Sequence, residues 1–349
     1  MRLPWPDLGA AADLAACRAL LRGGSRSFHA ASLVLPRRVR EPATALYAFC
    51  RLADDAIDLE NGRGHALARL RERLARAYDG RPLPVPADRA FATVVRRFGI
   101  PRALPEALLD GFAWDADGRR CADLAALHAY AARVAGSVGA MMALLMGARG
   151  EMALARACDL GVAMQLSNVA RDVGEDARAG RLYLPLDWMR EAGIDPEAWL
   201  AAPVFDQALG SVIARVLDEA ERLYARASVG VGLLPLACRP GIGAARRLYA
   251  EIGREVARGG FDSVSRRAVV PSHRKAWLLA LAVGDTICRR AGRCDPPLAE
   301  TGFLVEAAFA ARLPARQAAA WWDVGEQIAW IVELFHRLEM REHMGGTAP

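Results

Sequence analysis

The sequence predicts an all-α protein, and three observations support this prediction. Ala, Leu and Arg, which are strong helix formers, recur throughout, whereas Thr is scarce and β-branched residues rarely cluster. Apolar residues recur at spacings of three and four in nearly every segment, as in amphipathic helices. The 349 residues, of which 53% are hydrophobic and 25% charged, suffice for a large buried core. We expect residues 1–349 to form a single helical domain.

Helices are expected wherever the apolar stripe persists, and breaks are expected where Pro and Gly gather. Residues 43–57 carry one such stripe, and the Asn-Gly pair at 61–62 follows it as a stop signal. The other helices are expected at residues 64–79, 104–114, 124–146, 152–177, 205–233, 244–258, 274–291 and 315–341. Breaks are expected at residues 81–86, 235–243 and 295–297.

The cysteines and the apolar stretches exclude several classes of protein. The seven cysteines are scattered and form no Cys-x-x-Cys pair, which argues against a disulfide framework and a structural zinc site. Asp13 and Arg18 interrupt the N-terminal apolar patch, so it is a poor signal peptide. The longest uncharged stretch, residues 134–148, is shorter than the ~18 residues of a spanning helix. These features favour a cytoplasmic protein, either soluble or peripheral to a membrane.

The charge pattern and the glycines exclude further classes. The net charge of +6 comes almost wholly from arginine, since Lys275 is the only lysine. The arginines are spread along the chain without a basic block, so no nucleic-acid partner is expected, although the charge suits anionic substrates or lipid surfaces. The glycine pairs at 230–232 and 241–243 lack the third glycine of a dinucleotide-binding turn.

The first candidate site is an acidic face near the end of the helix expected at residues 43–57. Asp54 and Asp58 are four residues apart and therefore lie one turn apart on the same face, with Asp55 beside them. Aspartate inside a helix is unfavourable, so a ligand or partner should compensate for it. Arg51 stands beside this face.

The second candidate site is a ladder of oxygen-bearing side chains in the helix expected at residues 152–177. Asn168, Asp172 and Asp176 recur every fourth residue in apolar surroundings, and Arg171 stands beside them. Oxygen ligands suit Mg²⁺, which shares its ligands with substrate phosphates, and arginine binds phosphate oxygens. Either ladder alone would also fit a solvated helix face, but together they predict a cation site that holds a diphosphate. Because each ladder gathers like charges, Asp54→Asn or Asp172→Asn is expected to relieve repulsion and keep the fold.

The chain resembles the squalene/phytoene synthases, all-α enzymes of the isoprenoid synthase fold that join two prenyl diphosphates head to head. Five segments carry the resemblance in the order of the family: residues 25–28, 54–58, 130–139, 168–176 and 180–187. The resemblance covers a motif-bearing core at about 25–277, which a helical extension at about 303–344 follows. It implies helices that surround a central apolar cavity with two aspartate-rich helix faces.

Position by position, the resemblance implies the roles of individual residues. Mg²⁺ or Mn²⁺ would be bound by Asp54, Asp55, Asp58, Asn168, Asp172 and Asp176. The diphosphate would be contacted by Ser25, Ser27, Arg51, Gln165, Arg171 and Arg267, with Arg266 as the alternative to Arg267. The reacting carbons or the leaving group would be faced by Tyr47, Tyr130, Tyr183 and Tyr249, which act with the aspartates in catalysis. The apolar walls would be Val134, Val138, Met141, Met142, Leu145 and Met164.

Within the family, the run GRLYLPLDWMREAGI at residues 180–194 is most similar to bacterial members that make phytoene. This similarity implies the condensation of two geranylgeranyl diphosphates without NADPH. Two alternatives remain: a squalene or dehydrosqualene synthase that uses farnesyl diphosphate, and a catalytically inactive helical scaffold that binds lipids or partners. No obligate protein partner follows from the sequence, and release of an apolar product leaves peripheral membrane contact open.

Overall fold

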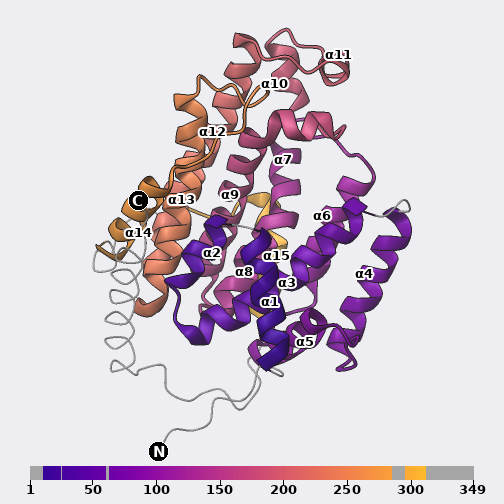
Figure 1. Cartoon of the computed structure of the whole chain (residues 1–349), viewed down its shortest axis with the longest axis vertical. Coiled ribbons are helices and arrows are strands. Elements are labelled where there is room, and N and C mark those ends of the chain that lie inside the picture. The colour runs from indigo at the N-terminus through magenta and orange to yellow at the C-terminus, as the bar shows by residue number, and fades with distance from the viewer. Residues whose placement is uncertain (1–10, 25, 60–62, 285–294, 312–349) are drawn as a thin grey trace, which may run out of the picture.

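The computed structural model of the chain describes residues 11–24, 26–59, 63–284 and 295–311, and all regular secondary structure in these ranges is helical (Figure 1). The predicted fold class is therefore confirmed. The first half contains α1 (Ala11–Gly24), α2 (Arg26–Leu33), α3 (Arg37–Leu59), α4 (Arg63–Tyr78), α5 (Pro86–Phe98), α6 (Ala103–Ala116), α7 (Leu124–Ala131), the π-helical turn η1 (Ala132–Gly136) and α8 (Ser137–Leu145). The second half contains α9 (Glu151–Arg178), α10 (Leu186–Glu191), α11 (Pro196–Ala201), α12 (Gln207–Val231), η2 (Leu236–Cys238), α13 (Arg239–Arg258), α14 (Ser272–Gly284), η4 (Ala299–Thr301) and α15 (Gly302–Ala310).

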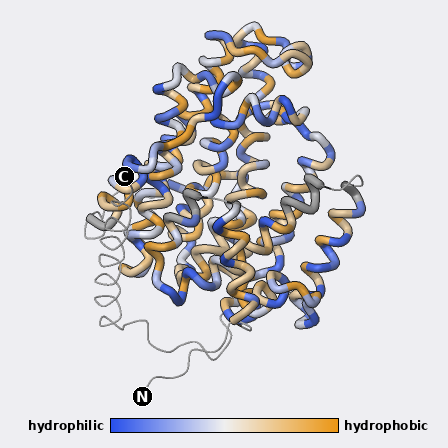
Figure 2. Tube along the Cα trace, viewed as in Figure 1, coloured by the Kyte–Doolittle hydropathy of each residue, from blue (hydrophilic) through white to orange (hydrophobic). Residues whose placement is uncertain are grey.

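Helix α9 runs through the middle of the bundle (Figure 1). It packs against η1 and α8, and also against α12 and α13, so most of its surface is enclosed. Buried apolar residues from most of the helices join in one large cluster around it. Apolar and polar residues alternate along most helices (Figure 2), as expected of helices with one face in the core. The position of α9 brings the predicted ladder of Asn and Asp into the interior of the bundle.

The helix expected at residues 124–146 is interrupted by a π-helical turn. Helix α7 ends at Ala131, η1 covers Ala132–Gly136, and α8 continues from Ser137. Glycines let η1 and α9 approach closely, because a Cβ on Gly161 would lie 2.3 Å from the backbone oxygen of Ala135. Among the described residues, no helix is both long and apolar enough to cross a bilayer.

Two prolines that the sequence analysis placed in breaks begin helices instead. Pro86 opens α5, and Pro240 lies in the first turn of α13, which starts five residues before the predicted helix at 244–258. Proline fits the first turn because its missing N–H has no partner there and its φ is already helical. Residues 81–85 of the predicted break at 81–86 and all of the predicted break at 295–297 are non-helical.

The prediction also omitted α1, α2, α5, α10, α11 and α15. In α1 the interruption by Asp13 is misleading: its carboxylate is buried and accepts a 2.8 Å hydrogen bond from Nε of Arg89 in α5. The periodicity of a single helix cannot predict this pair, because the partners are 76 residues apart. The helix expected at 315–341, the stop at 61–62 and the extension beyond residue 311 lie outside the described residues.

Candidate functional site

A cavity of about 720 Å³ lies among α3, α6, α7, η1, α8, α9, α13, α14 and the loops that follow α9 and α13. Most of the residues singled out by the sequence meet there. The predicted site residues that line the cavity are Tyr47, Arg51, Tyr130, Gln165, Asn168, Arg171, Asp172, Asp176, Tyr183, Tyr249 and Arg267. They come from segments more than 200 residues apart, so the bundle assembles one site from both halves of the chain.

The first acidic motif is described at the level of its helix. Helix α3 runs without a break from Arg37 to Leu59. Tyr47 and Arg51 of this helix line the cavity, and positions 54 and 58 follow Arg51 by about one and two turns. The side chains of Ser27, Asp54, Asp55 and Asp58, and the whole of Ser25, lie outside the described part. Their roles stay predictions.

The second motif forms the predicted ladder on α9. Asn168, Asp172 and Asp176 line the cavity from three successive turns of the helix. Gln165 also lines it, and its side-chain oxygen lies 3.5 Å from Nδ2 of Asn168. The ladder therefore points into the cavity rather than toward bulk solvent, which removes the interpretation of a solvated helix face.

Asp172 is held by two guanidinium groups. Nε of Arg171 and Nε of Arg267 each donate to Oδ1 of Asp172 at 2.7 Å. Burial raises the pKa of Asp172, but the hydrogen bonds from the two arginines outweigh it and lower the pKa below its usual value. The carboxylate thus stabilises the fold when it is charged. The expectation that Asp172→Asn would relieve repulsion is therefore wrong, because the site pairs this charge instead of crowding it.

Asp176 is in the opposite electrostatic situation. Burial, followed by the negative charges of Asp172, Glu175 and Asp115, raises its pKa to about 7, although Arg181 opposes the shift. A carboxylate in this position lacks sufficient positive charge around it. The repulsion between like charges that the sequence predicted for the ladder therefore acts on Asp176.

The loop at residues 259–271, between α13 and α14, brings Arg267 to α9. Gly174 allows the close approach, because a Cβ there would lie 2.4 Å from the backbone oxygen of Val264. Phe261 has a φ of 62°, a left-handed conformation, and the Asp262 carboxylate accepts a 3.1 Å hydrogen bond from the N–H of Val264. These features direct Arg267 to the cavity. The side chain of Arg266, the alternative in the sequence analysis, instead donates to the backbone oxygen of Gly259.

Asp115 organises two of the predicted tyrosines. The hydroxyl of Tyr183 donates to Oδ1 of Asp115 at 2.6 Å, and that of Tyr130 donates to Oδ2 at 3.1 Å. The two rings are stacked with centroids 4.9 Å apart. Burial, followed by the charge of Asp115, raises the pKa of both hydroxyls, so both tyrosines stay neutral. Sequence reasoning missed Asp115, because no other acidic residue lies three or four positions from it.

Arg181 and Lys275 also line the cavity and were not predicted. Signals for both existed in the sequence: Arg181 lies inside the run at 180–194, and Lys275 is the only lysine. They add two positive charges to those of Arg51, Arg171 and Arg267. The excess of cationic groups suits a ligand that carries several negative charges.

The apolar wall differs in part from the prediction. Val134 and Val138 line the cavity as expected, together with Leu108 and Phe112 of α6. Met141, Met142, Leu145 and Met164 are not among the residues that line this cavity. The first three lie farther along α8, where the bundle encloses them, and Met164 packs against both the main apolar cluster and a second one around α13 and α14.

The residues of α9 fit a hard divalent cation. Asn168, Asp172 and Asp176 offer only oxygen donors, and the charge deficit at Asp176 favours a positive ion there. In the part of the chain that the structure describes, no three acidic, histidine or cysteine side chains converge to form a complete metal site. Mg²⁺ keeps several waters and shares phosphate oxygens, so a few carboxylates suffice for it.

Comparisons with known proteins show the family to which the chain is related. Residues 21–275 match the family model described as squalene/phytoene synthase. A protein from Rhodobacter capsulatus named phytoene synthase is 58% identical over 274 residues, which are 78% of this chain and 81% of that protein. A protein of the same name from Cereibacter sphaeroides is 54% identical over 318 residues, or 87% and 90% of the two chains.

Solved structures show the same arrangement of helices. The crystal structure of a dehydrosqualene synthase in complex with a ligand superposes with a TM-score of 0.72 and 31% identity over 78% of this chain and 96% of that one. A squalene synthase from Alicyclobacillus acidocaldarius gives a TM-score of 0.66 with 25% identity over 72% of this chain and 95% of that one.

Proposed function

Because the chain belongs to the squalene/phytoene synthase family, we propose that it is a phytoene synthase, a prenyltransferase. It condenses two geranylgeranyl diphosphates head to head, through prephytoene diphosphate, to phytoene, and both diphosphates are released. This reaction is the first committed step of carotenoid biosynthesis. One observation carries the proposal: the oxygen ladder of α9, the cationic side chains and an apolar wall meet in a single cavity.

The polar part of the cavity binds the diphosphate groups. Guanidinium groups contact the phosphate oxygens with charge-assisted hydrogen bonds. The residues proposed for this role are Ser25, Ser27, Arg51, Gln165, Arg171 and Arg267. Mg²⁺ or Mn²⁺ would be held by Asn168, Asp172 and Asp176, with Asp54, Asp55 and Asp58 as the partners on α3. When bound, the cation neutralises the negative charge that develops on the departing diphosphate.

The aromatic and apolar residues act on the carbon chain. As the C–O bond of the first substrate breaks, its diphosphate leaves and an allylic cation forms. The double bond of the second substrate attacks this cation, and loss of a proton closes the cyclopropane of prephytoene diphosphate. The second diphosphate then leaves, and rearrangement with loss of a second proton gives phytoene. Tyr130 and Tyr183 line the cavity and, with Tyr47 and Tyr249, are proposed to face the reacting carbons and to stabilise positive charge there. Val134 and Val138 exclude water, which would otherwise trap the cation as an alcohol.

Product analysis tests the proposed function directly. Purified protein supplied with geranylgeranyl diphosphate and Mg²⁺ or Mn²⁺ should form a C40 hydrocarbon with the mass of phytoene and without a reductant. NADPH should change neither the rate nor the product mass. Farnesyl diphosphate should be a poorer substrate, because a shorter tail leaves part of the apolar wall uncovered, at ~0.8 kcal/mol per methylene.

The same assay separates the alternatives. A product two hydrogens heavier with NADPH, or a clear preference for the C15 substrate, would assign the chain to the squalene-type members that its structural neighbours represent. Binding of prenyl diphosphate without any turnover, at all metal concentrations, would favour the inactive scaffold.

Arg267 and its neighbour Arg266 offer a matched test of diphosphate binding. Arg267→Gln should raise the KM for geranylgeranyl diphosphate by about tenfold to a hundredfold, because one charge-assisted contact is lost. Arg266→Gln should leave the KM unchanged, since its side chain bonds to Gly259 outside the cavity lining. Steady-state kinetics measures both. An equal effect of the two substitutions would show that Arg267 has no specific contact with the substrate.

We also propose a cytoplasmic location, with contact to a membrane surface when the apolar product leaves. No nucleic-acid or obligate protein partner is part of the proposal. Residues 1–349 are proposed to form one domain, because the larger of two clusters of buried apolar residues in the described ranges extends from Cys17 in α1 to Ala308 in α15.

A further inference from the structure

The segment at residues 295–311 packs on the outside of the elements that wall the cavity. It contains η4 and α15, which is yellow in Figure 1. Helix α15 packs against α9, α8 and α6. Its residues Leu304, Val305 and Ala308 are buried. Among the described residues, none of those in α15 lines the cavity.

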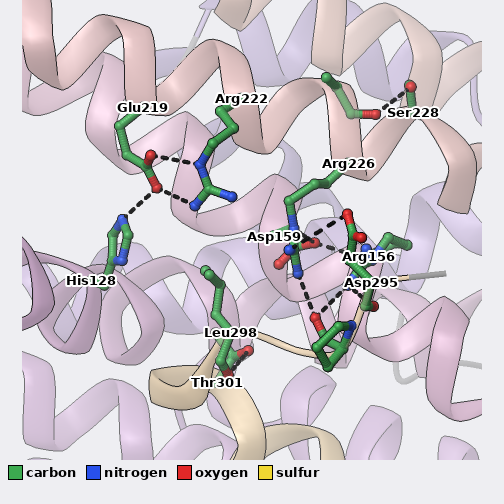
Figure 3. Close-up of polar contacts among 12 residues, drawn as sticks. His128, Arg156, Asp159, Glu219, Arg222, Arg226, Ser228, Asp295, Leu298 and Thr301 are labelled. Carbon is green, nitrogen blue, oxygen red and sulfur yellow. Dashed lines mark hydrogen bonds and ion pairs between the residues drawn. The ribbon is translucent and has the colours of Figure 1, made fainter. Parts of the chain in front are cut away.

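Guanidinium groups fix the start of this segment. Nη2 of Arg156 donates to the backbone oxygens of Asp295 and Pro296 at 3.0 and 3.2 Å. Nη2 of Arg226 donates to the backbone oxygen of Pro296 at 2.6 Å. The buried carboxylate of Asp159 lies 3.0 Å from Nε of both arginines and sets their positions (Figure 3).

The end of the segment is fixed in the same way. Nη1 of Arg149 donates to the backbone oxygen of Ala311 at 3.1 Å, and the same guanidinium also bonds to Phe98 of α5. Hydrogen bonds from charged donors are stronger than those between neutral groups. Helix α15 is therefore anchored at both ends, and its buried face has a defined position against the bundle.

Two residues of α15 lie beside the π-helical turn η1. Leu304 packs against Gly136, where an added Cβ would lie 3.4 Å from its Cδ1. The guanidinium carbon of Arg133, also in η1, lies 5.5 Å from the ring centroid of Phe303. Val134, the residue next to Arg133, lines the cavity. The turn η1 thus has α15 on one side and the cavity on the other.

A π-helical turn needs support from its surroundings, because isolated π-helix is rare. Here α6 supplies one support: a Cβ on Gly111 would lie 2.5 Å from Cγ1 of Val134. Helix α9 supplies the second through Gly161 and the backbone of Ala135. Helix α15 supplies the third through Phe303 and Leu304. A change in α15 can therefore move the wall without touching the substrate.

We propose that α15 sets the length of the prenyl tail that the cavity accepts, with Leu304 and Phe303 as positioning residues. They brace η1 and thereby hold Val134, and Val138 one turn later, in the apolar wall. The inference rests on the proposed function, because it assigns the apolar wall to the prenyl tail. It concerns tail length alone, since, among the described residues, none in α15 lines the cavity in which the diphosphate-binding residues lie.

Substitutions of opposite size at Leu304 test this inference. Leu304→Phe should push η1 into the cavity and lower the ratio of kcat/KM for the C20 diphosphate to that for the C15 diphosphate. The expected fall is about fourfold for each methylene-sized group excluded. Leu304→Ala should let the wall retreat and raise the relative kcat/KM of a C25 diphosphate. Leu304→Met, which keeps the volume, should restore the ratios of the unchanged protein.

Two further variants on α15 provide a second test of the brace and a control. Phe303→Leu removes the ring beside Arg133 from a position that is 42% exposed, so it tests the brace without opening the core, and it should shift the ratios in the direction of Leu304→Ala. Phe309→Ala is the control: Phe309 lies on the same helix but is 59% exposed, and its loss should leave all ratios unchanged.

The outcomes distinguish this inference from the proposed function. Equal losses for all tail lengths in folded Leu304 and Phe303 variants would overturn the inference and show that α15 only stabilises the bundle. If the Leu304 variants do not fold, an unchanged ratio in Phe303→Leu is sufficient to overturn it. Failure of the unchanged protein to make a C40 product would instead refute the proposed function.

Discussion

Asp176→Asn should lower turnover by on the order of 10² or more and at the same time raise the melting temperature of the metal-free protein. The loss of rate follows from removing one preorganised charge that orders the cation and the diphosphate. The gain in stability follows because burial and the carboxylates of Asp172, Glu175 and Asp115 raise the pKa of Asp176 to about 7. Above this pH Asp176 is charged in the folded protein, and its charge lowers the free energy of unfolding. A neutral amide at this position removes that penalty.

Asp172→Asn is the matched control for the second effect. It should reduce turnover to a similar extent but lower the melting temperature, because Asp172 accepts hydrogen bonds from Arg171 and Arg267 that hold its pKa below the usual range. Thermal unfolding in EDTA at pH 8, with turnover measured separately in Mg²⁺, checks both variants. Melting shifts of the same sign would contradict the electrostatic account, and near-native turnover in both folded variants would remove the ladder from the site.

Removal of divalent cations should abolish turnover altogether. The cavity places the oxygens of Asn168, Asp172 and Asp176 together, and the positive side chains alone leave Asp176 short of compensating charge. A divalent cation supplies several kcal/mol of charge stabilisation to the departing diphosphate, equivalent to roughly 10³-fold or more in rate. Assays after dialysis against EDTA, followed by titration with Mg²⁺, Mn²⁺ or Ca²⁺, measure this dependence.

Two controls separate a catalytic role of the cation from a structural one. Circular dichroism should show the same helix content with and without EDTA, because the helices pack through an apolar core. Mg²⁺ or Mn²⁺ should restore the activity fully. A turnover rate that is unchanged after exhaustive chelation would contradict the interpretation of the two ladders as cation sites.

Much of the fold followed from local sequence pattern. The helices around residues 64–79, 104–114 and 152–177 are found within a few residues of the predicted ends, because each carries its own apolar stripe. The errors have a shared origin in contacts between helices. Asp13 in α1 is stabilised by Arg89 in α5, and η1 depends on the close approach of Gly161 to Ala135.

The polar ladder on α9 was predictable for the same reason. Asn168, Asp172 and Asp176 recur at the period of the helix, so the spacing alone places them on one face. The apolar wall was harder to predict. Val138, Met141 and Leu145 all follow the spacing of one helix face, so the spacing does not indicate which of them reaches the cavity. Only the tertiary structure distinguishes Val138, which lines the cavity, from Met141, which is buried and is not part of its lining.

The sequence by itself determined the class of fold, the polar ladder on α9 and the family, because these are carried by periodicity and by motifs within single segments. The tertiary structure alone decided which residues join the ladders: Asp115 of α6 with Tyr130 and Tyr183, and Arg267 rather than Arg266 with Asp172. It also decided that Asp172 is paired whereas Asp176 is crowded. The physical reason is that the energy of a charge depends on the groups packed around it, and those groups come from helices far apart in the chain.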